Sequence, residues 1–329
     1  MGTGSWRIWV VAVVLAGVAM AAPFLATAAP VEIRIGHGFA AEEQLWLMKA
    51  RPDLTPNQGK AYTLRYTPFR GNTDRFNAFL AGQIDGGTVT GFTAIFARSE
   101  GVPLKIVASI CRESLQGFRT TFLAAGDSGI QRVSDLRGRT IGIVDFKSAT
   151  DLWAREALRK EGIDPDRDAK LVVVAFPAQG NALRTRKIDA GVFPQPFYAA
   201  EMGKGGVRAI FDSKYAFTFD EELMQIFFSE KFLREQRRVV EAFLSDYLLV
   251  NKFYIERNQE ARRALLDAKM VRTPEKIYLE MADWYRTPDA RVDVESLTKL
   301  QEMIIANGWL EKGKRINVRD LVDLSYLPR

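Results

Sequence analysis

The sequence predicts an α/β protein of two similar lobes, each with a mostly parallel sheet and flanking helices, and with a ligand cleft between the lobes. A short unit occurs twice, since residues 78–87 read AFLAGQIDGG and residues 182–191 read ALRTRKIDAG. A strand–loop–helix pattern precedes each copy, beginning near residues 31 and 140. The alternative is chance similarity, because Ile-Asp after a helix is common. Two matched units favour one lobe architecture built twice.

The first lobe is predicted from apolar strands that alternate with helical segments between residues 31 and 110. One of these helices carries Phe76, Phe79 and Leu80 on a single face, which is the spacing of a core stripe. Strands that alternate with helices are typical of a parallel sheet.

The chain is then expected to cross to a second lobe and return. The second lobe is predicted at residues 116–225, and the first lobe at residues 29–115 and 226–329, including C-terminal helices that cover it. Residues 223–228 have the apolar pattern of a returning strand. Such a double crossing predicts a hinge about which the lobes can close.

The N-terminal residues 1–28 are predicted to be a signal peptide. Arg7 precedes an apolar run from Ile8 to Leu25, and the small residues Ala26-Thr27-Ala28 resemble a signal-peptidase site. An uncleaved membrane anchor is the alternative, since the run is nearly long enough to span a bilayer. No cysteine lies near the site, which excludes a lipid anchor there. Cleavage after Ala28 would leave the mature protein in the periplasm.

Composition excludes several classes of protein. The 329 residues include a single cysteine, Cys111, so disulfide bonds within the chain cannot stabilise the fold. The formal net charge of +6 is mild, and no Lys/Arg run with interleaved aromatic residues occurs, so the sequence does not predict nucleic-acid binding.

Catalytic and metal motifs are weak. The sequence Gly126-Asp127-Ser128-Gly129 resembles a serine-protease nucleophile motif, but the chain has one histidine and an α/β pattern, so a turn is predicted. His37 is that histidine; it has no clustered partners for zinc, and ligand contact and helix capping both fit its place after the first strand. No phosphate-loop, dinucleotide or HExxH motif occurs, so no cofactor and no metal are expected.

Ligands of open α/β sheets bind outside the carboxyl ends of the strands. Several loops at these ends lead directly into helices, whose free N–H groups favour an anion. Arg70 and Lys147 could add positive charge, and Asn72 and Ser148 could contact a ligand or cap helices. An apolar ligand body could be covered by phenylalanines, although for each of them taken alone a core position is the favoured interpretation: Phe39, Phe92, Phe146 and Phe193.

Residues 134–176, SDLRGRTIGIVDFKSATDLWAREALRKEGIDPDRDAKLVVVAF, resemble the nitrate/sulfonate/taurine-type substrate-binding proteins of ABC transporters. Residues 188–191 (IDAG), 83–86 (QIDG) and 101–106 (GVPLKI) match further steps of the same pattern. The resemblance covers nearly all of the chain after residue 28, and it implies a two-lobed type II periplasmic binding fold.

The resemblance also implies which loops contact the ligand. Many members have Glu where this chain has Gln195, which removes a repulsive charge for an anion or a partner for a cationic nitrogen. Together with the analysis of the loops, it gives these expected ligand-binding residues: His37, Gly38, Phe39, Arg70, Gly71, Asn72, Thr73, Thr88, Thr90, Lys147, Ser148, Phe193 and Gln195.

The function implied is that of a monomeric, non-enzymatic solute-binding component of an ABC importer. It would capture a small organic molecule, an anionic sulfonate or carboxylate, by lobe closure and deliver it to an inner-membrane permease. One alternative is a sensor that presents its ligand to a membrane receptor. Another is a pyrimidine-synthase-like enzyme on the same fold, against which the single cysteine and the predicted signal peptide argue.

Overall fold

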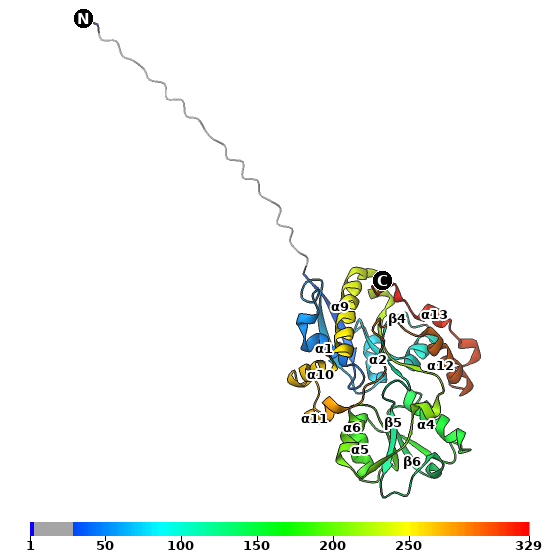
Figure 1. Ribbon diagram of the computed structural model, residues 1–329. Coiled ribbons are helices and arrows are strands. Elements are labelled where there is room, and N and C mark those ends of the chain that lie inside the picture. Colours follow the sequence, from blue (N-terminus) through cyan, green and yellow to red (C-terminus); the bar gives the residue numbers. More distant parts are fainter. Residues whose placement is uncertain (3–28, 329) are drawn as a thin grey trace.

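The computed structural model describes residues 1–2 and 29–328 (Figure 1). The predicted signal peptide lies outside the described residues, apart from its first two positions. Within the described part of the chain, no helix combines the length and apolar character that a membrane crossing requires. The remainder forms two lobes, and the second lobe, coloured green, lies below the first in Figure 1.

Each lobe contains a five-stranded sheet, which confirms the predicted fold class. In each sheet one strand, β10 or β5, runs antiparallel to both of its neighbours. The first sheet has the order β2 (Tyr62–Pro68), β1 (Val31–His37), β3 (Gly86–Thr90), β10 (Glu221–Ser229) and β4 (Leu104–Glu113). The second has the order β7 (Lys170–Val173), β6 (Thr140–Ile143), β8 (Ala190–Phe193), β5 (Thr121–Ala125) and β9 (Val207–Asp212).

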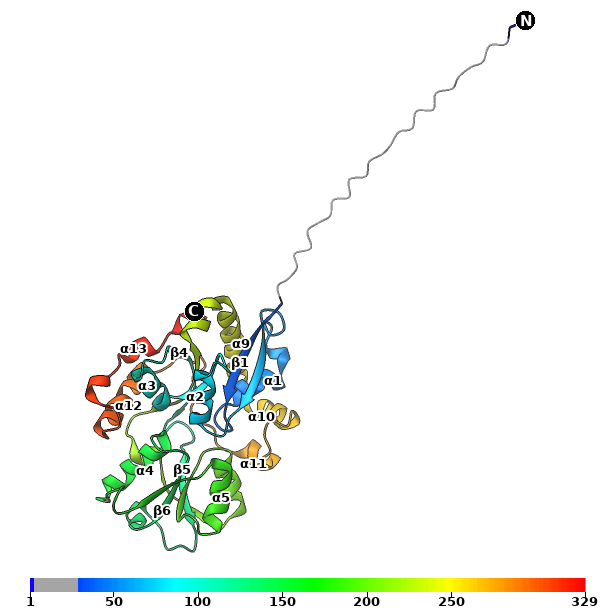
Figure 2. The ribbon, with the colours of Figure 1, turned by 180° about the vertical axis from the view of Figure 1, so that it is seen from behind.

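Helices cover both sheets. Figures 1 and 2 show α4 on one side of the second sheet and α5 and α6 on the other. The first lobe carries α1 (Glu43–Ala50), α2 (Asn72–Leu80), α3 (Gly91–Ser99), α8 (Glu230–Glu235), α9 (Arg237–Glu256), α10 (Asn258–Asp267), α11 (Glu275–Glu280), α12 (Val294–Ala306) and α13 (Val318–Leu321). The second lobe carries α4 (Ala149–Lys160), α5 (Phe176–Arg184), α6 (Phe197–Lys204) and α7 (Ser213–Ala216).

The two copies of the Ile-Asp unit make the same contacts in the two lobes. Asp85 donates its N–H to the carbonyl of Arg34 at 2.9 Å and accepts the Arg34 N–H at 2.8 Å. Asp189 does the same with Thr140, at 2.7 and 2.8 Å. Each carboxylate therefore fixes the start of the following strand, β3 or β8, against a neighbouring parallel strand, β1 or β6. The repeat thus has a structural role, and chance similarity does not explain it.

The close approach of β3 to β10 requires a residue without a side chain at Gly86. A Cβ there would lie 2.2 Å from the carbonyl oxygen of Phe227 and 2.4 Å from the ring of Phe228. We therefore expect Gly86→Ala to lower the free energy of unfolding by about 1–3 kcal/mol in a urea titration. Gly313→Ala is the control, because a Cβ at Gly313 meets nothing within 4 Å. Equal stabilities of the two variants would contradict the close approach.

Among the described residues, two chain segments join the lobes, residues 114–120 and 217–220. A third segment packs against the first crossing, since the N–H of Phe118 donates to the carbonyl of Asp283 at 2.6 Å. The ring of Phe118 also meets Trp284 edge to face, with 5.2 Å between centroids. Nearby, α11 contacts α6 of the second lobe.

The return to the first lobe comes earlier than the predicted position, residue 226, because β10 already begins at Glu221. Glu221 and Glu222 are fully buried in this strand, and their carboxylates accept hydrogen bonds from Trp153 and Ser109. Glutamate is rarely fully buried, so the apolar pattern of residues 223–228 does not by itself extend the strand to these two residues.

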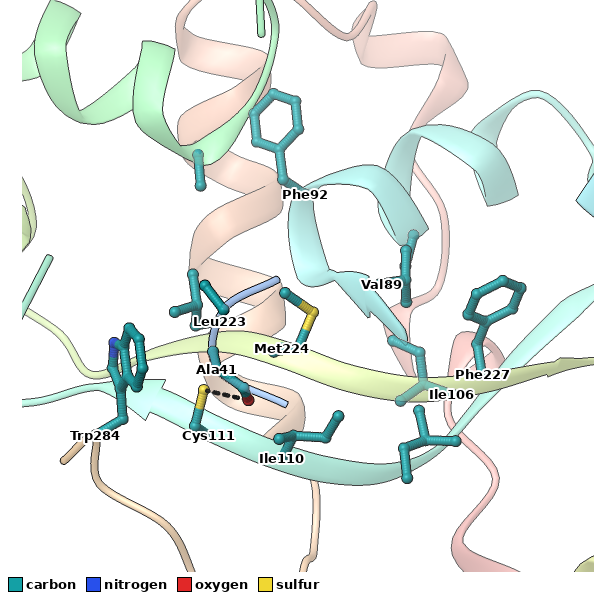
Figure 3. Close-up of a cluster of buried hydrophobic side chains, with 14 of the residues drawn as sticks. Ala41, Val89, Phe92, Ile106, Ile110, Cys111, Leu223, Met224, Phe227 and Trp284 are labelled. Carbon is teal, nitrogen blue, oxygen red and sulfur yellow. Dashed lines mark hydrogen bonds between the residues drawn. The ribbon is translucent and has the colours of Figure 1, made fainter. Parts of the chain in front are cut away.

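The core beside the hinge is formed by strands β4 and β10 with the loop before α1 (Figure 3). Cys111 lies within it, and its thiol points toward the carbonyl of Ala41 at 3.9 Å. Burial raises the pKa of the Cys111 thiol well above its usual value, so the thiolate needed for nucleophilic chemistry does not form near neutral pH. Leu223 and Met224 from β10 and Trp284 border the same cluster.

Candidate functional site: a cleft between the lobes

A cleft of about 850 Å³, part of it open to solvent, lies between the lobes at the carboxyl ends of the strands. Both lobes line it, as the fold predicts. The first lobe contributes Gly38, Phe39, Ala40, Ala41, Glu42, Phe69, Arg70, Gly71, Asn72, Arg75, Thr90, Leu223, Met224 and Trp284. The second lobe and the crossing contribute Thr120, Val144, Asp145, Ser148, Ala149, Thr150, Trp153, Phe176, Pro177 and Pro194.

Much of the wall is apolar. Aromatic rings line it from both sides, namely Phe39, Phe69 and Trp284 on the first lobe and Trp153 and Phe176 on the second. Phe39 is 46% exposed, which is unusual for a large apolar side chain. Rings on opposing walls provide surfaces between which an apolar ligand body can be enclosed when the lobes close.

The charged floor of the first lobe is an ion pair between Glu42 and Arg75. The Arg75 guanidinium lies 3.2 Å from the Glu42 carboxylate, and their side chains are 4% and 0% exposed. Burial lowers the pKa of Arg75, and the Glu42 carboxylate opposes that effect. Arg75 also donates to the side chain of Asn72, so it links the start of α2 to this floor.

On the second lobe, α4 presents its N-terminus to the cleft. Ser148 is the N-cap, and its hydroxyl accepts the Asp151 N–H at 3.4 Å. Ala149 and Thr150, the first two residues of α4, line the cleft, and neither backbone N–H has an acceptor among the residues that the structure describes. Unpaired N–H groups at the positive end of a helix favour an anionic group.

The cleft is closed by contacts between the lobes. The indole N–H of Trp153 on α4 donates to Glu221 of β10 at 2.7 Å. At the mouth, the Thr73 hydroxyl of the first lobe donates to the Asp145 carboxylate of the second. Farther out, Asn307 after α12 donates to Glu156 on α4 at 2.9 Å. The structure therefore represents an arrangement in which the lobes touch around the cleft.

Seven of the thirteen residues expected at the ligand line this cleft: Gly38, Phe39, Arg70, Gly71, Asn72, Thr90 and Ser148. Arg70 is exposed and forms no ion pair with another described residue, so it presents a free positive charge. The structure thus brings together loops from both lobes that are distant in the sequence.

The other residues expected on the first lobe lie beside the cleft. His37 is buried behind its wall, where its Nδ1 lies 2.9 Å from the carbonyl oxygen of Gly38 and 3.2 Å from the indole nitrogen of Trp46, and its ring meets Tyr66. Thr88 donates to Glu42 at 2.7 Å, and Thr73 is engaged with Asp145. These three positions support the residues around the cleft and do not face it.

Three expected residues of the second lobe also lie away from the cleft. Lys147 is exposed and does not line it. Phe193 is fully buried in a small core with Leu123 and Leu183. Gln195 is buried, and its side-chain oxygen accepts the Ala199 N–H at 3.2 Å within α6.

The other two candidate phenylalanines are not in the cleft wall. Phe92 is fully buried against Phe96 and Trp309, whereas Phe146 is 51% exposed. Of the four phenylalanines considered from the sequence, only Phe39 lines the cleft.

Sequence reasoning missed several cleft residues. Glu42 closely follows one predicted ligand loop. Arg75 lies in the first turn of the helix that follows a second predicted ligand loop. Both residues could therefore have been predicted by the same argument. Trp153 lies on the helix that follows a third predicted ligand loop, but farther from the loop than Glu42 and Arg75 are from theirs, so the sequence indicates its position less clearly. Met224 and Trp284 reach the cleft only through long-range packing, and no local pattern predicts them.

A metal centre does not arise from the described residues. Among them, no group of three or more His, Cys, Asp or Glu side chains is arranged to hold a metal ion.

The chain was compared with known proteins once this geometry was established. A family model described as NMT1/THI5 like matches residues 63–268. The chain belongs to this family. The NMT1/THI5-like region begins in β2 and ends just after α10, so it includes parts of both lobes and both crossings.

Individual relatives agree with the family match. A putative aliphatic sulfonates-binding protein of Escherichia coli (strain K12) is 27% identical over 149 residues, which are 45% of this chain and 45% of that protein. The match thus spans less than half of the length of the curated relative.

Solved structures show the same fold. The ligand-binding component of an ABC-type import system from Staphylococcus aureus has a TM-score of 0.75 at 15% identity, covering 90% of this chain and 97% of that one. The alkanesulfonate-binding protein SsuA from Xanthomonas axonopodis pv. citri, bound to MOPS, has a TM-score of 0.71 at 19% identity, covering 90% and 99%. These likenesses confirm the two-lobed binding-protein fold that the resemblance of residues 134–176 implied.

Proposed function

We propose that this protein is the solute-binding component of an ABC importer and captures a small organic anion, a sulfonate or carboxylate, by closing its lobes. The observation that carries this proposal is the cleft itself, which lies at the strand ends and is lined by both lobes. The similarity to a sulfonates-binding protein and the fold of the solved structures support the ligand class. The protein would act in the periplasm after signal-peptide cleavage, as a monomer that delivers its ligand to a permease.

The proposed pose follows from the polarity of the cleft wall. The anionic group lies at the N-terminus of α4, where the N–H groups of Ala149 and Thr150 are unpaired, and within reach of Arg70. The apolar body lies between the rings of Phe39 and Phe176 on opposing lobes. A ligand that touches both lobes stabilises the closed arrangement over the open one, which is the required mechanism of capture.

Binding without chemistry is the mechanism that these residues favour. The thiol of Cys111 is buried, and His37 is engaged behind the wall by Trp46. Neither side chain lines the cleft, so the two residues that most often act as nucleophile or base cannot reach a ligand there.

The first test is a thermal-shift screen of the purified protein against alkanesulfonates, carboxylates, nitrate and nitrogen heterocycles. A ligand that binds only the folded state raises the melting temperature by mass action. A shift with sulfonates or carboxylates is expected. A shift with heterocycles alone would overturn the anion assignment, and no shift with any compound would contradict the proposed function.

Arg70→Ala is expected to weaken binding of the sulfonate identified in that screen by roughly ten- to a hundredfold, because a charge-assisted hydrogen bond to the anionic group is lost. Lys147→Ala is the matched control. Lys147 carries the same charge but lies outside the cleft wall, so its removal should change the Kd by less than about threefold. Isothermal titration measures both values. Equal losses would show that general electrostatic attraction, and not contact with Arg70, determines affinity.

A further inference from the structure

Glu42 already occupies the donors that the first lobe offers to an anion. Its carboxylate accepts the Gly38 N–H at 3.0 and 2.8 Å, the Thr88 hydroxyl at 2.7 Å and the Arg75 guanidinium at 3.2 Å. These donors come from the end of β1, from β3 and from α2. Strand ends and helix starts of this kind form the anion sites of open α/β sheets. Here a side chain of the protein takes the place of the ligand.

The fit around this carboxylate is close. A Cβ at Gly38 would lie 3.0 Å from the Glu42 carboxylate and 3.3 Å from the Arg75 guanidinium. The Glu42 side chain is shielded from bulk solvent, yet the residue lines the cleft. Its negative charge therefore acts on a bound ligand with little screening by water.

The charges that line the cleft sum to zero. Arg75 is paired with Glu42, and the other two charged residues of the wall, Arg70 on the first lobe and Asp145 on the second, have opposite signs. A ligand with one negative charge is stabilised by Arg70 and by the helix end. A second negative charge would be buried beside Glu42 and Asp145 without a counter-charge, which is costly in a shielded site.

We propose that Glu42 is a specificity-determining residue, which fills the anion site of the first lobe and so makes the cleft selective for singly charged over doubly charged anions. The proposal deepens the proposed function and rests on it for the identity of the cleft as the ligand site. A purely structural role for Glu42, fixing the loop before α1, would affect both classes of anion equally.

Methanesulfonate and sulfate test this selectivity, because their tetrahedral heads are similar and their charges differ. Isothermal titration of the wild-type protein should give a Kd for sulfate at least about tenfold above that for methanesulfonate. Glu42→Gln frees a positive charge on Arg75 and should lower the sulfate-to-methanesulfonate Kd ratio by about tenfold or more. Glu42→Gln combined with Arg75→Gln restores the charge balance, and its ratio should return toward that of the wild type.

Each outcome decides the proposal. Equal wild-type affinities for the two anions would overturn it, and that measurement needs no variant that must fold. A change of both affinities by the same factor in Glu42→Gln, or the same gain for sulfate in the double variant, would also overturn it. If the wild type binds no sulfonate or carboxylate at all, the proposed function fails. A gain of sulfate binding in Glu42→Gln that the double variant loses would still support the role of Glu42.

Discussion

Affinity for an alkanesulfonate is expected to fall as the pH rises, by up to about tenfold per pH unit between roughly pH 5 and pH 8. The cause is Glu221, whose carboxyl lies in the first-sheet strand β10 beneath Trp153 of the second lobe. Burial raises the pKa of Glu221 from its usual 4.5 to about 8, and the Trp153 hydrogen bond offsets only part of this effect. The nearby carboxyl of Glu113 raises the pKa further.

The sign follows from the raised pKa. We expect opening of the lobes to withdraw Trp153 and to expose Glu221 to water, which would return the pKa of Glu221 toward its usual value. Between pH 4.5 and about pH 8, Glu221 is therefore protonated in the closed form and ionised in the open form. Low pH favours closure for this reason, and the preference for the closed form is lost as the pH rises through about 8. Calorimetry in two buffers with different ionisation heats should detect proton uptake when the ligand binds.

Two variants separate Glu221 from other titrating groups. Glu221→Gln retains an acceptor for the Trp153 indole but cannot titrate, so its affinity should be nearly independent of pH over the same range. His37→Gln, which removes the single histidine of the sequence, is the second variant. If the pH dependence of the affinity disappears in His37→Gln and persists in Glu221→Gln, its assignment to Glu221 is wrong.

Arg286→Ala is expected to destabilise the first lobe by about 3–5 kcal/mol, because it leaves the buried carboxylate of Glu43 without its partner. The Arg286 guanidinium lies 2.6 Å from Glu43 and 3.1 Å from Asp283, and it also donates to Gln44 at 2.6 Å. Burial acts to raise the pKa of Asp283, but the charges of Arg286 and Arg262 outweigh it and hold that pKa below its usual value.

Urea unfolding followed by circular dichroism measures this loss. Arg315→Ala provides the comparison, because the Arg315–Glu302 pair is about half exposed and should contribute less than about 1 kcal/mol. Similar free energies of unfolding for the two variants would mean that the buried network contributes no more than a surface ion pair does.

The two lobes were predictable from the sequence because the patterns that indicate their strands and helices lie within short stretches of the chain. The Ile-Asp unit recurs since each lobe needs a carboxylate to fix one strand start against another, as Asp85 and Asp189 do. Apolar stripes on helices and apolar strands have the same local character. These patterns determine which segments form strands and helices, and their order determines the fold.

The cleft wall was only partly predictable, because it depends on which way side chains face. All four residues of β8 are buried, so no alternation distinguishes a cleft-facing residue from a core residue, and Phe193 proved to pack in the core. Glu42 and Arg75 meet across different elements, and Trp284 arrives from the C-terminal part of the chain. Such pairings are set by tertiary packing, which a single sequence does not display.

The contact between α11 and α6 has a mechanical consequence. Helix α11 follows the helices of the first lobe in the chain, yet it touches the second lobe, and residues 281–286 after it are fastened to a crossing segment at Phe118. Rotation of the lobes must therefore displace this part of the chain as well. We therefore expect this contact to limit how far the lobes can swing, so removal of the residues from 275 onward should widen the range of opening.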